Sequence, residues 1–124
     1  MKFLFILLAF STLLTGCCPA DAEFGFLSAT DAYELIASGT DVVIVDVRSE
    51  MEFLAGHIAD SVLLPVDEIA DRAEDILLDK DAVILVICQF GNRSQVASQM
   101  LANLGFLHIY DMGGIMSWPG EIVQ

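Results

Sequence analysis

One short segment, Cys88–Ser94, holds the residue types that could do covalent chemistry, and it reads CQFGNRS. A thiolate is a nucleophile, and a nearby cation or the amino end of a helix stabilises its negative charge. Arg93 would supply the cation, and a helical pattern that begins at Ser94 would supply the helix end. Gly91 suits a tight turn, because it has no Cβ. The segment therefore predicts a reactive cysteine beside a site for an anion.

The residues on either side place this segment in a fold. Residues 82–87 form an unbroken apolar run, which is typical of a strand buried on both faces. The residues after it have helical spacing, with apolar side chains at Val96, Ala97, Met100, Leu101 and Leu104. Ligands of open α/β sheets bind outside the carboxyl ends of the strands. The loop is thus predicted at the edge of a sheet where ligands bind.

The rest of the chain alternates between the two kinds of pattern. Helical patterns are expected after the capping residues Ser28–Asp31, at Glu50–Ala55 and at Val66–Leu78, and strands at Val42–Val47, Ser61–Leu64 and Leu107–Tyr110. This order predicts one α/β domain with a central parallel sheet flanked by helices on both faces.

Composition excludes some functions. The chain has 124 residues, with five Lys and Arg against 18 Asp and Glu, and a net charge of −13. Nucleic-acid binding needs a basic surface, and the acidic balance also disfavours direct docking on anionic lipids. The two histidines and the cysteine of the domain lack metal-ligand spacing. We expect no metal and no other cofactor.

The amino-terminal segment predicts export. Residues 3–14 are nearly all apolar, but this run is shorter than the ~20 residues that span a bilayer, as in a signal peptide. Leu14–Cys17 resembles the lipobox of bacterial lipoproteins, which implies cleavage before Cys17 and acylation of its thiol. The predicted parts are a signal peptide over 1–16, a tether over 17–26 and a domain over 27–124.

An alternative cleavage site follows Ala22, where Ala20–Ala22 forms an A-x-A pattern that would release a soluble periplasmic or secreted domain. Both readings place the domain outside the cytoplasm, and the first one anchors it to the cell envelope by lipid alone. Cys17 and Cys18 then lie in the leader or tether. Cys88 is left without a disulfide partner in the domain, so it is either an inert buried thiol or a reactive one.

Several short motifs, in this order, together resemble a single-domain rhodanese. They are Asp46-Val47-Arg48, Glu52-Phe53, Gly56-His57-Ile58, Pro65, Cys88-x-x-Gly91-x-Arg93-Ser94 and Gly113-Gly114-Ile115-x-x-Trp118. The resemblance runs from about Leu27 to the carboxyl terminus and implies a rhodanese-like fold. It implies sulfurtransferase activity, in which a sulfane sulfur passes from a donor to a thiophilic acceptor.

The resemblance assigns roles to individual residues. Cys88 would be the nucleophile and would carry the persulfide. Arg93 would bind the anionic end of a donor such as thiosulfate, and the acceptor would be a thiol, including that of a protein. The cradle around the sulfur would comprise Gln89, Phe90, Gly91, Asn92 and Ser94. Asp46 and Arg48, after the neighbouring strand, are expected to pair and brace the loop, whereas His57 and Trp118 are expected to be structural.

Two other functions compete with this one. Related phosphatases have five residues between the cysteine and the arginine, whereas here four residues, 89–92, separate Cys88 from Arg93. The shorter loop favours sulfur transfer over phosphate hydrolysis. A non-enzymatic sulfur carrier or redox sensor would use the same cysteine. Phe90 makes the rim apolar, which favours a protein or organic persulfide as the donor over thiosulfate.

Overall fold

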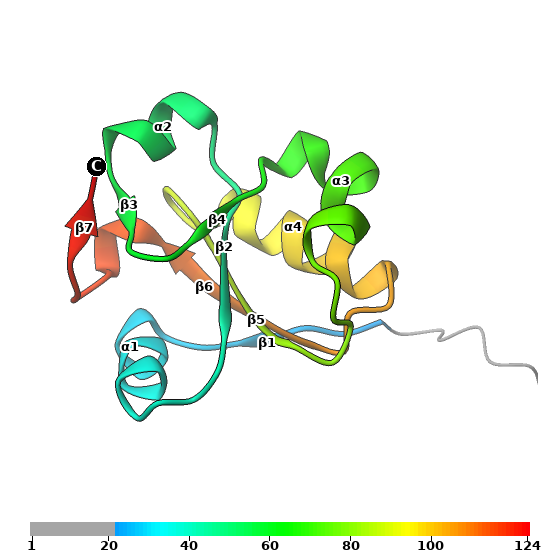
Figure 1. Ribbon diagram of the computed structural model, residues 1–124, viewed down its shortest axis with the longest axis horizontal. Coiled ribbons are helices and arrows are strands. Elements are labelled where there is room, and N and C mark those ends of the chain that lie inside the picture. The colour runs from blue at the N-terminus through cyan, green and yellow to red at the C-terminus, as the bar shows by residue number, and fades with distance from the viewer. Residues whose placement is uncertain (1–21) are drawn as a thin grey trace, which may run out of the picture.

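The computed structural model describes residues 22–124, and its centre is a five-stranded parallel sheet (Figure 1). The strand order is β1-β6-β5-β2-β4. The strands are β1 (Gly25–Phe26), β6 (His108–Gly114), β5 (Val83–Cys88), β2 (Val43–Asp46) and β4 (Val62–Leu63). The predicted signal peptide, the lipid attachment at Cys17 and the tether up to residue 21 lie outside the described residues.

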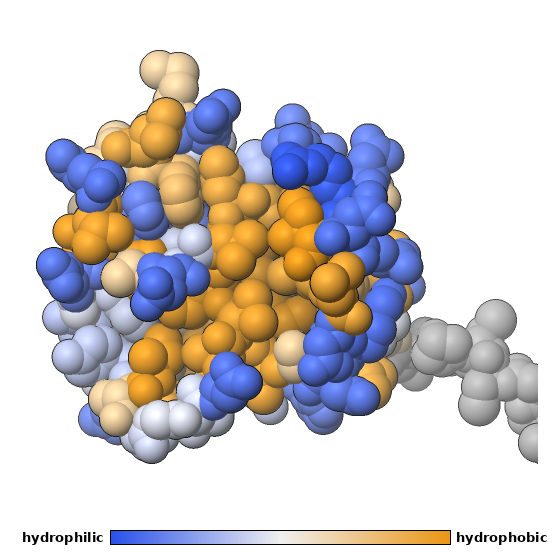
Figure 2. All heavy atoms as spheres, viewed as in Figure 1, coloured by the Kyte–Doolittle hydropathy of each residue, from blue (hydrophilic) through white to orange (hydrophobic). Residues whose placement is uncertain are grey.

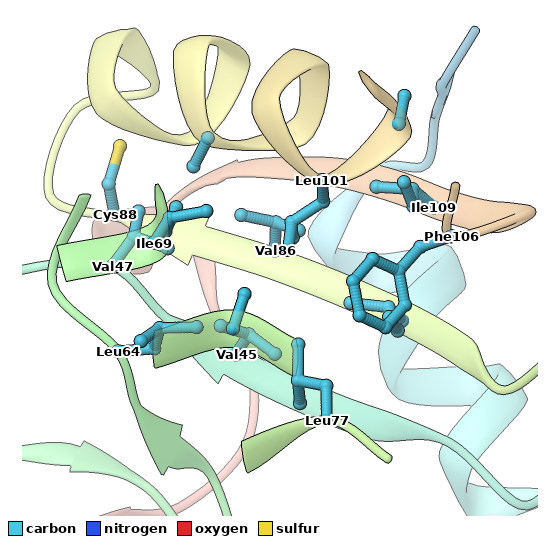
Figure 3. Packing of buried hydrophobic residues seen from close by; sticks show 14 residues of the cluster. Val45, Val47, Leu64, Ile69, Leu77, Val86, Cys88, Leu101, Phe106 and Ile109 are labelled. Carbon is cyan, nitrogen blue, oxygen red and sulfur yellow. The ribbon is translucent and has the colours of Figure 1, made fainter. Parts of the chain in front are cut away.

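Helices cover both faces of the sheet, as predicted. One face packs against α3 (Ile69–Ile76) and α4 (Asn92–Asn103), and the other against α1 (Ala29–Ala37). Alternate residues of β5 divide between the two cores. Val86 and Cys88 pack with Leu101 and Ile109 on the α4 face (Figure 3), while Leu85 and Ile87 pack with Ala32 on the α1 face. A strand buried on both sides explains the unbroken apolar run at 82–87.

Side-chain caps fix where the first helices begin. The Ser28 side chain accepts a hydrogen bond from the amide of Asp31 at the start of α1. A capping box starts α2 (Glu50–Ala55), because the Ser49 side chain bonds the Glu52 amide and the Glu52 carboxylate bonds the Ser49 amide. The acidic stretch from Val66 forms the 3-10 helix η1 (Val66–Glu68) and then α3.

Three short strands were not predicted. Gly25–Phe26 pairs with β6 as β1, so the sheet begins two residues before the predicted domain boundary at residue 27. β3 (His57–Ile58) pairs antiparallel with β7 (Ile122–Val123), which makes β7, rather than the predicted 107–110, the last strand. Two-residue strands show no periodicity, because their extended conformation comes from a partner that is distant in sequence.

Hydrophobic residues are also exposed on the surface of the domain. In Figure 2 a band of hydrophobic residues crosses the middle of the face in view, between hydrophilic margins. A pocket of about 350 Å³ lies at the edge of the sheet by β4, lined by residues that include Val43, Val62 and Leu78. Within residues 22–124 no helix is both long enough and apolar enough to cross a membrane.

Candidate active site

Cys88 is the last residue of β5, a strand in the interior of the sheet, and its side chain is a free thiol. The residue is only 1% exposed. Figure 3 shows its sulfur at the end of the strand, on the side of the sheet that carries α4. The amide of Gly91 donates a hydrogen bond of 3.0 Å to Sγ. A backbone donor is thus already aimed at the atom where negative charge would reside.

The loop after Cys88 turns sharply into α4. Gly91 is the residue before the helix and has a φ of +97°, a backbone conformation that residues with a Cβ rarely adopt. The buried Ser94 hydroxyl donates to the Gly91 carbonyl oxygen at 3.1 Å. The helix begins at Asn92, two residues earlier than predicted, and Asn92 itself is exposed. The amino end of α4 therefore starts directly beside the sulfur.

Strand β6 closes the loop from the other side. Cys88 pairs with Gly114, after a register shift that sets Val86 against Asp111 and Ile87 against Gly113. A Cβ on residue 114 would overlap the carbonyl oxygen of Gln89. The backbone of β6 thus touches the backbone of the loop, which only glycine allows. The sequence motif Gly113-Gly114 pointed to this segment, but it did not predict the contact between Gly114 and the Gln89 carbonyl.

Asp46 and Arg48 form a buried ion pair beneath the loop. Their relative exposures are 0% and 4%. Both carboxylate oxygens accept from the guanidinium, with Nη2 to Oδ2 at 2.8 Å and Nε to Oδ1 at 3.0 Å. Arg48 also donates to the carbonyl oxygen of Gly56 at 2.6 Å and to the side-chain amide oxygen of Gln89 at 3.2 Å. The pair therefore connects the end of β2 to the loop that follows Cys88, and so supports that loop.

Arg93, expected to hold the donor, is paired with Glu52 of α2. Its two terminal nitrogens donate to the two carboxylate oxygens of Glu52, at 2.6 Å and 2.9 Å. Such a two-point contact is the strongest geometry for this pair of groups. The hydrogen bond from Arg93 holds the pKa of Glu52 at about 2, below its ordinary value of 4.5, and in return raises the pKa of Arg93. Glu52 is therefore ionised at any pH near neutrality.

The lowered pKa of Glu52 predicts an acid-dependent loss of stability. Because this pKa is lower in the folded chain, the pair stabilises the fold fully above about pH 4.5 and loses its effect as the pH falls towards 2. Glu52 is 33% exposed, so solvent screens the pair, and its contribution to the free energy of unfolding is about 1 kcal/mol. Glu52→Gln should lower the free energy of unfolding in urea at pH 7 and match the wild type near pH 2. An equal deficit at both pH values would contradict this.

An open pocket lies next to the loop. Its volume is about 450 Å³, and its lining includes Arg48, Glu52, Gln89, Met116 and Ile122. Met116 belongs to the 3-10 helix η2 (Ile115–Ser117), is 73% exposed and accepts from the Gln89 side chain through its sulfur. Phe90, which is 80% exposed, extends from the loop itself. The pocket and the loop beside it thus present exposed apolar side chains next to paired charges.

His57 and Trp118, the other motif residues, make their contacts away from the loop. His57 Nδ1 lies 2.9 Å from the Phe53 carbonyl oxygen, and its ring stacks on that of Phe53 with 3.8 Å between centroids. Trp118 packs edge-on against Tyr33. Neither approaches the cysteine through any contact found in the described residues. Among residues 22–124, no group of three or more His, Cys, Asp and Glu side chains is arranged to hold a metal.

Sequence reasoning missed two residues that the structure brings to the site. Glu52 was noted only as part of a motif with Phe53, and its partner Arg93 lies 41 residues further along the chain. Met116 follows the two glycines and carries no pattern of its own. The only available signal for Glu52 was its position in the capping box of a helix beside the expected sheet edge.

Comparison with known proteins agrees with this geometry. Residues 28–121 match the model of the rhodanese-like domain. The chain belongs to the rhodanese-like family. It is 37% identical over 108 residues to the thiosulfate sulfurtransferase GlpE of Pseudomonas entomophila, which covers 83% of this chain and 95% of the relative. The GlpE of Pseudomonas syringae is 42% identical over 107 residues, 82% of this chain and 97% of the relative.

A solved structure gives the same picture in three dimensions. The rhodanese-related protein of Thermoplasma volcanium superposes with a TM-score of 0.70 at 34% identity, over 81% of this chain and 98% of that one. The predicted family and the predicted α/β architecture are both confirmed. The likeness in sequence to the two relatives over nearly their whole length makes this rhodanese-like chain a sulfurtransferase of the rhodanese type.

Proposed function

We propose that the domain moves a sulfane sulfur from a donor, such as thiosulfate or a persulfide, to a thiophilic acceptor through a persulfide on Cys88. One observation carries this proposal: a free cysteine ends an interior strand, and the amide of the loop that follows already donates to its sulfur. The GlpE relatives are named as thiosulfate sulfurtransferases, which supports thiosulfate as a donor to test.

Two displacements at sulfur complete the reaction. The Cys88 thiolate attacks the sulfane sulfur of thiosulfate, the new S–S bond forms, and sulfite leaves with the electron pair of the broken bond. The thiolate of the acceptor then attacks the outer sulfur of the persulfide, and Cys88 leaves as a thiolate again. The backbone of the loop, fixed by Gly91 and braced by Arg48 through Gln89, would hold the negative sulfur in both steps.

The shape of the site agrees with transfer of one atom. Because Cys88 is 1% exposed, only a slim reactive end reaches its sulfur, while the body of a donor or acceptor stays at the rim. The rim offers Phe90 and the pocket beside Gln89 for that body. A persulfide on Cys88 would add a second sulfur atom, which an acceptor thiol must reach from the rim.

The test is the mass of the protein after exposure to donor. The purified domain, residues 22–124, should gain the mass of one sulfur atom on Cys88 when incubated with thiosulfate or with an organic persulfide. Intact mass spectrometry followed by peptide mapping would show the gain, and cyanide or a thiol should remove it. A domain that takes up sulfur from no donor would refute the proposal.

Turnover distinguishes an enzyme from a carrier. Steady release of sulfite with a thiol acceptor supports catalysis, whereas a persulfide that forms once and persists until a partner protein binds supports the carrier. Hydrolysis of an aryl phosphate would indicate the phosphatase, which the four-residue spacing disfavours. Export and lipid attachment at Cys17 stay predictions from the sequence.

A further inference from the structure

Every strong base in the described part of the chain has an acidic partner of its own. Among residues 22–124 the ion pairs are Arg48 with Asp46, Arg72 with Glu68, Lys80 with Glu74, and Arg93 with Glu52. Two of these cations, Arg48 and Arg93, lie at the active loop. Within residues 22–124 an anionic donor thus meets no cation that lacks a counterion, and the whole chain has a net charge of −13.

The two cations at the loop differ in their exposure and in the number of groups to which they donate hydrogen bonds. Arg48 is 4% exposed, and its guanidinium donates hydrogen bonds to Asp46, Gln89 and Gly56. These contacts hold it in a structural position. Arg93 is 36% exposed and binds Glu52 alone, so it is the cation that a donor can reach. Both of its terminal nitrogens are already used by the carboxylate.

Glu52 is itself held in position. Its Oε1 accepts from the Ser49 hydroxyl at 3.0 Å and from the Ser49 amide at 3.3 Å, as the capping box of α2. A donor that displaced Glu52 from Arg93 would leave a carboxylate fixed on the wall of the pocket. Since Coulomb energy scales with the product of the charges, this repulsion is twice as large for a dianion as for a monoanion.

We propose that Glu52 is a specificity-determining residue, which as the internal counterion of Arg93 favours sulfane donors of low charge over the thiosulfate dianion. The favoured class is the monoanionic organic persulfide or thiosulfonate, whose body contacts Phe90 and Met116 at the rim. Both side chains are largely exposed, at 80% and 73%, and so are available to an apolar body. This inference rests on the proposed sulfur transfer at Cys88 and adds the residue that selects the donor.

The test compares donors of different charge in variants of the same helix. Thiosulfate carries two negative charges and methanethiosulfonate carries one, and each gives Cys88 one sulfur while sulfite or methanesulfinate leaves. Glu52→Gln removes the charge but keeps the cap, because glutamine also serves at that position of a capping box. Glu50→Gln is the matched control, since Glu50 is exposed on the same helix and makes no ion pair among the described residues.

The expected result is a rise in kcat/KM whose size depends on the charge of the donor. In Glu52→Gln, kcat/KM should rise roughly tenfold for thiosulfate and about threefold for methanethiosulfonate at low salt, and both gains should shrink as salt screens the charges. Glu50→Gln should change neither value by as much as twofold. Glu52→Ala, which also loses the cap, is the second variant and should show the same ratio between the two gains.

Two failures are distinguishable. If the wild-type domain loads sulfur from neither donor, the proposed function fails. If it loads sulfur but Glu52→Gln gains nothing, gains equally with both donors or matches Glu50→Gln, the role of Glu52 is refuted while sulfur transfer stands.

Discussion

Cys88→Ser is expected to remove sulfur transfer, lowering kcat by roughly 10⁴-fold or more, the scale seen when an enzyme loses its nucleophile. A serine hydroxyl fits the space of the thiol, but it is a far weaker nucleophile and forms no persulfide. The measurement is sulfite release from thiosulfate with a thiol acceptor, together with intact mass after donor treatment.

The control for this change is Gln95→Ala, at an exposed position one turn into α4. It leaves the loop and the Gly91 amide in place and should keep wild-type turnover. Because Cys88 is buried in the core that α4 covers, the serine variant must also be shown to fold, by its thermal unfolding. A folded Cys88→Ser protein that still releases sulfite at more than a hundredth of the wild-type rate would contradict the assignment.

Asp46→Ala is expected to have the largest effect on stability. Asp46 is fully buried, and its removal leaves the guanidinium of Arg48, at 4% exposure, without its counterion. Breaking a buried ion pair in this way costs about 3–5 kcal/mol, a large part of the ~5–15 kcal/mol that holds a domain folded. Urea unfolding would measure it. Turnover should fall as well, because Arg48 also holds Gln89 of the active loop.

Two comparisons isolate the cause. Glu68→Ala breaks the exposed pair with Arg72, whose side chains are 41% and 50% exposed, and should cost about 0.5 kcal/mol at most. The double change of Asp46→Leu with Arg48→Met removes both charges and should recover much of the lost stability, since no charge is left buried. If Asp46→Ala costs no more than Glu68→Ala, the pair does not support the fold as described.

Much of the architecture was predictable because local patterns agree with it. The unbroken apolar run before Cys88 predicted the two-sided burial of β5, and the helix over Glu50–Ala55 was predicted at the limits the structure shows. In β5 the apolar run agrees with burial on both faces, and at α2 the Ser49–Glu52 capping box agrees with the start of the helix. The family motifs then located the loop, because Cys88, Gly91, Arg93 and Ser94 all belong to one of them.

The rest depends on contacts between distant segments. The pairing of β3 with β7 joins residues near 58 to residues near 122, and no local pattern in two residues records it. The partner of Arg93 was likewise invisible, because an acidic chain offers many carboxylates and only the packing of α2 beside the loop selects Glu52. The charge state of the site was therefore the least predictable part of its chemistry.

The contact between Gly114 and the Gln89 carbonyl means that a strand outside the loop helps to set the shape of the loop. A Cβ at residue 114 would overlap the Gln89 oxygen, so any side chain there would displace the start of the loop. The surroundings of Cys88 therefore depend on two segments about 25 residues apart, and a change in one of them constrains the other.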